Sequence, residues 1–205
     1  MLFKAHINRH TLTDVPLAHY FRDRLLETLK QAQQPTPPPH IDTIWYLSKL
    51  LERFSDSAQL FSYDRGRLSV RPLALLYGDA QETSNKHDRC LILRQLGDLT
   101  LFMGALFPET FKRRGIRKDY IVGMGGGAYD YLAEHADRHR PIFSQLANQF
   151  SSLLPLVSKA CAKEQCFDFS DVLQLLQRWE ESHDPAIERQ LAALGIPLES
   201  SQKLH

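Results

Sequence analysis

An aspartate in the most apolar part of this chain is the first candidate for chemistry. Asp98 stands among leucines in the stretch 91–107, whose helical pattern is apolar nearly all round. A carboxylate buried there is too costly to keep ionised without a partner. Arg94 lies one helical turn earlier, and Tyr120 and Tyr129 are hydroxyl donors further along the chain. Two interpretations stay open. Asp98 is either a structural hydrogen-bonding group that links the central helices, which we favour, or a general base in a ligand pocket.

The segment YIVGMGGGAYDYL, residues 120–132, is the second candidate because of its glycines. Gly123, Gly125 and Ala128 match the G-x-G-x-x-A spacing of a dinucleotide-binding turn. That turn needs a parallel sheet and an acidic residue about 20 residues further on. The sequence at that distance, HADRHRPIFSQL, is typical of one helix ending and another beginning. We therefore expect no nucleotide, and no other cofactor, here.

The same glycines have two other interpretations if the segment is helical. Gly123 and Gly127 lie one turn apart, which predicts a bare face against which another helix packs closely. Alternatively the helix breaks at Gly125, and the free amides of Gly125 and Gly126 bind an anion. A ligand site in this region would combine residues of both candidates: Asp98, Tyr120, Gly125, Gly126 and Tyr129.

A run of cations in FKRRGIRKDY, residues 111–120, is the strongest charge feature of the chain. Such a run could contact phosphates, with an aromatic side chain beside them. Gly115 within the run is a helix-stop signal, and cations at a helix end also complement the helix dipole. The net charge of only +1 argues against nucleic acid as the partner. The candidate anion-binding residues are Arg113, Arg114, Arg117 and Lys118.

Two histidines have the spacing of metal ligands on a helix. His135 and His139 are one turn apart, but the segment between them is polar and precedes Pro141. No third ligand is evident, so we expect a solvated helix end and no metal. The three cysteines of the chain fit no zinc pattern and favour a reducing compartment.

Apolar residues at helical spacing run through most of the sequence. We predict an all-α, single-domain bundle of about eight to nine helices, with a small β-hairpin near residues 61–70 as its one sheet candidate. Helices are expected at about 17–33, 41–54, 72–81, 87–107, 119–139 and 141–164, with a kink at Pro155, and after cap residues Ser170 and Asp184.

A proline-rich segment, QQPTPPPH, interrupts this pattern early in the chain. It cannot continue a helix and should run extended as a stiff connector. We therefore divide the chain into an N-terminal arm helix (1–34), a linker (35–40) and a helical domain (41–205).

Several stretches resemble a family of small helical bacterial proteins with no known activity. They are QLGDLTLFMGALFPETFKRR and DYIVGMGGGAYDYL, with IWYLSKLLERF before and LLQRWEES and LAALGIP behind. The resemblance covers about Ile41 to Pro197 and implies a self-standing bacterial domain. It brings no cofactor and no catalytic residue.

Composition and charge narrow the function classes. The most apolar window contains Arg94, Gln95 and Asp98, so it fails as a membrane span. The start MLFKAHINRH lacks the apolar core of a signal peptide, and we expect a cytoplasmic protein.

We predict a helical interaction or regulatory module that binds a protein partner or a second copy of itself, and is not an enzyme. The alternative is a small-molecule or anion-binding helical protein, or an enzyme. Its site would lie between the Asp98 helix and the glycine-rich helix Tyr120–Tyr131.

Overall fold

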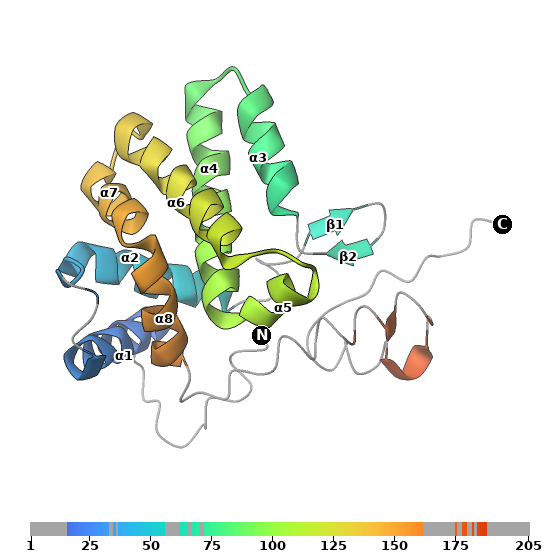
Figure 1. Ribbon diagram of the computed structural model, residues 1–205, viewed down its shortest axis with the longest axis horizontal. Coiled ribbons are helices and arrows are strands. Elements are labelled where there is room, and N and C mark those ends of the chain that lie inside the picture. Colours follow the sequence, from blue (N-terminus) through green and yellow to red (C-terminus); the bar gives the residue numbers. More distant parts are fainter. Residues whose placement is uncertain are drawn as a thin grey trace. The chain divides into compact units, whose positions relative to one another are not determined.

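The computed structural model describes residues 16–32, 35, 37–55, 62–64, 67–69, 72–161 and, near the C-terminus, 175, 178–179, 182 and 184–187. Within these residues the protein is all-α, as predicted, with eight helices and one hairpin (Figure 1). The helices are α1 (Leu17–Ala32), α2 (Ile41–Phe54), α3 (Leu73–Glu82), α4 (Lys86–Leu106), α5 (Pro108–Arg113), α6 (Lys118–His135), α7 (Arg140–Asn148) and α8 (Phe150–Cys161).

Contacts divide the chain into two compact units. The larger, here called the helical unit, comprises Asp14–Glu52 and Pro72–Glu164, and the smaller comprises Met1–Thr13, Arg53–Arg71 and Gln165–His205. In the smaller unit, β1 (Ser62–Asp64) pairs antiparallel with β2 (Arg67–Ser69), so the predicted hairpin is confirmed.

Helix α4 is the centre of the helical unit. It begins after Asn85, whose side chain accepts a hydrogen bond from the backbone N–H of His87 at 2.9 Å. Its neighbours α3, α5, α6 and α8 all contact it, and α6 runs beside it (Figure 1). Most of its second half is buried, as its all-round apolar pattern predicts.

Two glycines of α4 allow the neighbouring helices to come close. A Cβ on Gly97 would lie 2.9 Å from Cε1 of Tyr129, on α6. A Cβ on Gly104 would lie 2.9 Å from Cγ2 of Ile121 and 3.2 Å from Cδ2 of Leu154. Both positions are therefore too tight for any side chain.

The predicted close helix crossing at Gly123 and Gly127 is wrong. Both glycines are exposed, and an added Cβ would meet nothing within 4 Å at either. Helix α6 also runs unbroken through the cluster, so the predicted break at Gly125 is wrong as well. The buried face of α6 instead carries Ile121, Gly125, Ala128 and Leu132, and a Cβ on Gly125 would overlap the ring of Phe150.

Helix α1 docks within the helical unit. It contacts α8, and the backbone N–H of Ala18 donates to Oε1 of Glu52 at 3.2 Å. The ring of His19 meets the edge of Trp45, and the guanidinium of Arg22 lies 4.8 Å from the same ring. The division into arm, linker and domain stays a prediction.

The helix expected at 141–164 is two helices. The chain turns at Gln149, between α7 and α8, whereas Pro155 lies inside α8. Pro155 has no backbone N–H, so the carbonyl of Ser151, one turn earlier, has no helical hydrogen-bond donor. Ser151 is exposed in the first turn of α8, where water can donate instead, and the helix therefore tolerates the proline. Of the later caps, Asp184 accepts from the backbone N–H of Ala186 at 2.8 Å, while Ser170 lies outside the described residues.

Candidate functional site

Asp98 is the buried centre of a hydrogen-bond cluster. Its side chain is 1% exposed, and its Oδ1 accepts from the hydroxyls of Tyr46 at 2.6 Å and Tyr129 at 2.7 Å. Nε of Arg94 lies 3.9 Å from Oδ2 and donates to the Tyr46 hydroxyl at 3.2 Å. The cluster, Asp98 with Tyr46, Tyr129 and Arg94, ties α2, α4 and α6 together.

The environment keeps Tyr46 in its neutral form. Burial raises the pKa of Tyr46 well above its usual value, and the negative charge of Asp98 raises it further. The charge of Arg94 opposes this effect only in part. A neutral phenol is a hydrogen-bond donor, which is what the carboxylate of Asp98 needs.

Aromatic rings fill the space around this cluster. The ring of Tyr129 is stacked on that of Phe143, with centroids 6.1 Å apart, and it also contacts Phe150 and Tyr46. Asp98 lines neither of the two pockets described below. The arrangement therefore fits a polar tie in a packed core better than a ligand site.

The five residues of the predicted ligand site do not come together. Only Asp98 and Tyr129 are joined by a side-chain hydrogen bond, whereas Tyr120 is 45% exposed at the start of α6. Gly125 lies under Phe150, and the nearest atoms to a Cβ on Gly126 would be 3.8 Å away. Tyr46, which completes the cluster, is absent from the sequence-based site because it lies 52 residues before Asp98 on the amphipathic helix α2.

The two candidate metal ligands are not one turn apart on a helix. Helix α6 ends at His135, whose ring stacks on Tyr131 and whose Nδ1 lies 3.0 Å from the Tyr131 carbonyl oxygen. His139 follows in a left-handed conformation, with φ 66°, before α7. Within the described ranges, no group of three or more His, Cys, Asp and Glu residues could hold a metal ion.

The predicted helix stop at Gly115 is confirmed, and it shapes the basic run. Pro108 opens α5 directly after α4, and α5 ends at Arg113. Gly115 has φ 71°, a conformation that favours glycine. Its N–H donates to the Lys112 carbonyl at 3.0 Å, and the N–H of Ile116 donates to the Phe111 carbonyl at 2.9 Å. This hydrogen-bond pair is the Schellman motif that ends many helices.

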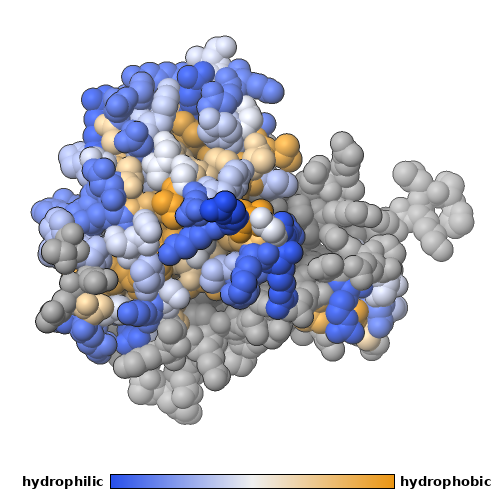
Figure 2. Space-filling view, in the orientation of Figure 1, coloured by the Kyte–Doolittle hydropathy of each residue, from blue (hydrophilic) through white to orange (hydrophobic). Residues whose placement is uncertain are grey.

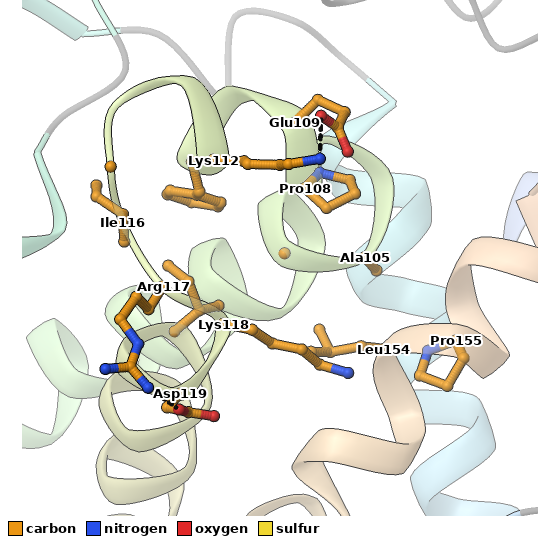
Figure 3. A pocket seen from close by; sticks show the side chains of 14 residues that line it. Ala105, Pro108, Glu109, Lys112, Ile116, Arg117, Lys118, Asp119, Leu154 and Pro155 are labelled. Carbon is orange, nitrogen blue, oxygen red and sulfur yellow. Dashed lines mark hydrogen bonds and ion pairs between the residues drawn. The ribbon is translucent and has the colours of Figure 1, made fainter.

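Next to this turn the surface is hollowed into a groove of about 730 Å³, here called the α5 groove (Figure 3). It is built from the end of α4, most of α5 and the turn that follows it, the start of α6 and the middle of α8. Figure 2 shows hydrophobic surface in the middle of the visible face, with strongly hydrophilic residues beside it. The apolar lining of the α5 groove comes from Gly104, Ala105, Pro108, Phe111, Ile116, Ile121, Leu154 and Pro155.

The rim of the α5 groove is charged. Lys112 pairs with Glu109 at 3.5 Å, and Arg117 pairs with Asp119 at 3.0 Å (Figure 3). Lys118 extends from α6 toward Leu154 and Pro155, and no carboxylate among the described residues forms an ion pair with it. Of the four predicted anion-binding residues, Arg117 and Lys118 line the groove, whereas Arg113 and Arg114 are exposed residues beside it.

A second pocket, of about 600 Å³, lies between the linker and α7. Its polar groups are largely engaged with each other. Oε1 of Gln145 accepts from the backbone N–H of His40 at 2.9 Å and from the Thr43 hydroxyl at 2.6 Å, and Nε2 of Gln149 donates to the Pro37 carbonyl at 2.7 Å. This pocket fits a structural junction that fixes the linker.

The fold and the site together define the protein as an all-α protein with an open, charge-rimmed groove. Comparisons with protein-family models, with curated proteins and with solved structures find no match. Among the described helices, none has the length and apolar character needed to cross a membrane.

Proposed function

We propose that this chain is a helical interaction module without catalytic activity, which binds a partner protein through the α5 groove. The observation that supports this most is the groove itself, which combines an apolar floor with an exposed charged rim. Ile121 and Leu154, 3% and 5% exposed, form part of the floor, while the side chains of the rim residues Lys112 and Arg117 are 78% and 83% exposed. An apolar centre within a polar rim is the usual anatomy of a protein interface.

The buried carboxylate supports a non-catalytic role. Asp98 accepts two tyrosine hydrogen bonds and sits among packed rings, so its polar atoms serve the fold. A general base must lie within hydrogen-bond reach of a substrate proton, and the Asp98 side chain is almost entirely enclosed.

Site-specific cross-linking tests this proposal. A photoreactive amino acid at Glu109, on the rim, should capture a partner in the cells that make the protein. The same amino acid at Leu91, which is 54% exposed on the first half of α4, is the matched control. The partner, once identified and purified, should bind Ile116→Ser more weakly than the parent, because Ile116 lines the groove. Equal capture from position 91, or unchanged affinity of Ile116→Ser, would contradict the proposal.

A small-molecule or anion-binding role is the second candidate, because the groove volume lies within the roughly 300 to 1,000 Å³ of known ligand pockets. Native mass spectrometry of protein from its own host separates the two: a bound small molecule supports this candidate, and a partner chain or second copy supports the first.

A cytoplasmic location belongs to the same proposal. It is supported by Cys90, which is a free thiol. A bacterial origin rests on the sequence resemblance alone.

A further inference from the structure

We infer that the α5 groove binds a partner segment that is both apolar and acidic. The inference rests on the proposed function and adds the chemistry of the partner. It follows from two properties of the groove, its floor and the balance of charge on its rim.

The floor requires apolar side chains from the partner. Gly104 has no side chain, so Ile121 and Leu154 pack directly onto α4 and leave a shallow apolar surface there. Ile116 and Phe111, next to the turn at Gly115, also line the groove. The apolar area still open to water in the groove lies mainly on Ile116, Pro108 and Pro155, and covering it favours binding in a way that a purely polar ligand does not provide.

The rim carries an excess of positive charge. The residues that line the groove include three cations, Lys112, Arg117 and Lys118, and two carboxylates, Glu109 and Asp119, which leaves a net +1. The exposed Arg113 and Arg114 beside the groove raise the local excess to +3. The two ion pairs on the rim are solvent-exposed, so their cations can exchange partners at little cost. Acidic groups beside the apolar anchor of a partner would complete this charge pattern.

The start of α6 adds to the preference for a carboxylate. Its N-cap residue, Arg117, makes no side-chain capping hydrogen bond. Arginine has no acceptor atom, so it cannot satisfy the first N–H groups of the helix. A carboxylate from the partner at this end of the groove would do so, and the helix dipole would favour its charge.

A pair of fluorescent peptides tests the inference on the full-length protein. Both carry leucines at the same helical spacing, and the remaining positions are all glutamate in one peptide and all lysine in the other. Fluorescence anisotropy should show the glutamate peptide binding about tenfold more tightly or better than the lysine peptide, with a preference that weakens as salt rises.

Three protein variants locate the binding. Lys118→Glu should weaken the glutamate peptide by about tenfold, because attraction is replaced by repulsion. Lys86→Glu is the matched control: it makes the same change at the start of α4, roughly 27 Å along the helix from Gly104. Ile116→Ser should weaken both peptides, since each uses the apolar lining to which Ile116 belongs.

The other outcomes separate the two proposals. Equal binding of both peptides, still sensitive to Ile116→Ser, would overturn the acidic partner and leave the groove as the site. Binding of neither peptide would overturn both. Saturable one-to-one binding of dodecanoate, without binding of either peptide, would replace the partner protein with a small amphiphile.

Discussion

The Asp98 cluster and the α5 groove contain similar residue types but differ in how their charges are satisfied. In the cluster, one carboxylate oxygen accepts two tyrosine hydrogen bonds, and aromatic rings exclude water. On the groove rim, the two ion pairs are formed by side chains that are 66% to 84% exposed.

This difference assigns the two sites to different tasks. Removing the hydrogen-bond partner of a buried polar group costs much stability, because water cannot take the place of that partner. Breaking an exposed ion pair costs little stability, since water solvates both charges. The cluster should therefore control stability, and the groove should control binding.

The largest expected effect is that of Asp98→Ala. The change leaves the hydroxyls of the half-buried Tyr46 and the buried Tyr129 without this acceptor, and each loss costs roughly 1 to 3 kcal/mol. Urea denaturation should show a loss of about 3 kcal/mol in the free energy of unfolding. Asp119→Ala, at an exposed ion pair on the groove rim, should change it by less than about 0.5 kcal/mol. Similar losses in the two variants would remove the distinction between the sites.

Gly97→Ala should also lower stability, because its Cβ would push against the Tyr129 ring that donates to Asp98. Overpacking of this kind typically costs about 1 to 3 kcal/mol. Gly127→Ala is the control on the exposed face of α6, where an added Cβ meets nothing, and it should stabilise the helix by up to about 1 kcal/mol. Thermal melts of both variants show whether each change raises or lowers the melting temperature. A stabilised Gly97→Ala would show that the Tyr129 ring is not tightly held.

The effect of Tyr46→Phe on stability should depend on pH. At neutral pH the loss of a hydrogen bond to a carboxylate should cost roughly 1.5 to 3 kcal/mol. The pKa of Tyr46 is raised in the folded state, so its contribution is full below the unfolded-state pKa of about 10 and is lost as pH rises beyond it. Urea titrations at pH 7 and above pH 10 should therefore show the difference between parent and variant shrinking. A constant difference would mean that Tyr46 titrates as in the unfolded chain.

The smallest effect on stability is expected from the basic run. Replacement of Arg113, Arg114 and Lys118 by glutamine should shift the free energy of unfolding by less than about 0.5 kcal/mol. The three side chains are exposed, so water already solvates their charges and removing these charges changes stability little. A clear loss of stability would place these cations in the fold rather than at a binding surface.

The helices were largely predictable from the sequence because local signals define them. Apolar spacing placed α4 and α6 to within a few residues, and Gly115 marked the end of α5, although α5 itself was not among the predicted helices. The turn at Gln149 was missed, because proline is the stronger breaker signal and Pro155 stands only six residues later.

The sites were less predictable, because they depend on which face of each helix is buried. Asp98 and Tyr129 were paired correctly as candidates, but Tyr46 could not be linked to them across 52 residues of sequence. Glycines lie on two faces of α6, and spacing alone does not tell the packed Gly125 from the exposed Gly127. The apolar lining of the groove comes from four separate helices and a turn, so no single stretch carries its signal.

Binding and stability measured together on two variants test the central claim most directly. The glutamate peptide is titrated against parent, Tyr46→Phe and Lys118→Glu at a temperature where circular dichroism shows all three folded. We expect Tyr46→Phe to melt at a lower temperature yet bind the peptide as the parent does, and Lys118→Glu to melt as the parent does yet bind about tenfold more weakly. Parental binding by Lys118→Glu, or weakened binding by folded Tyr46→Phe, would contradict the separation of a stabilising cluster from a binding groove.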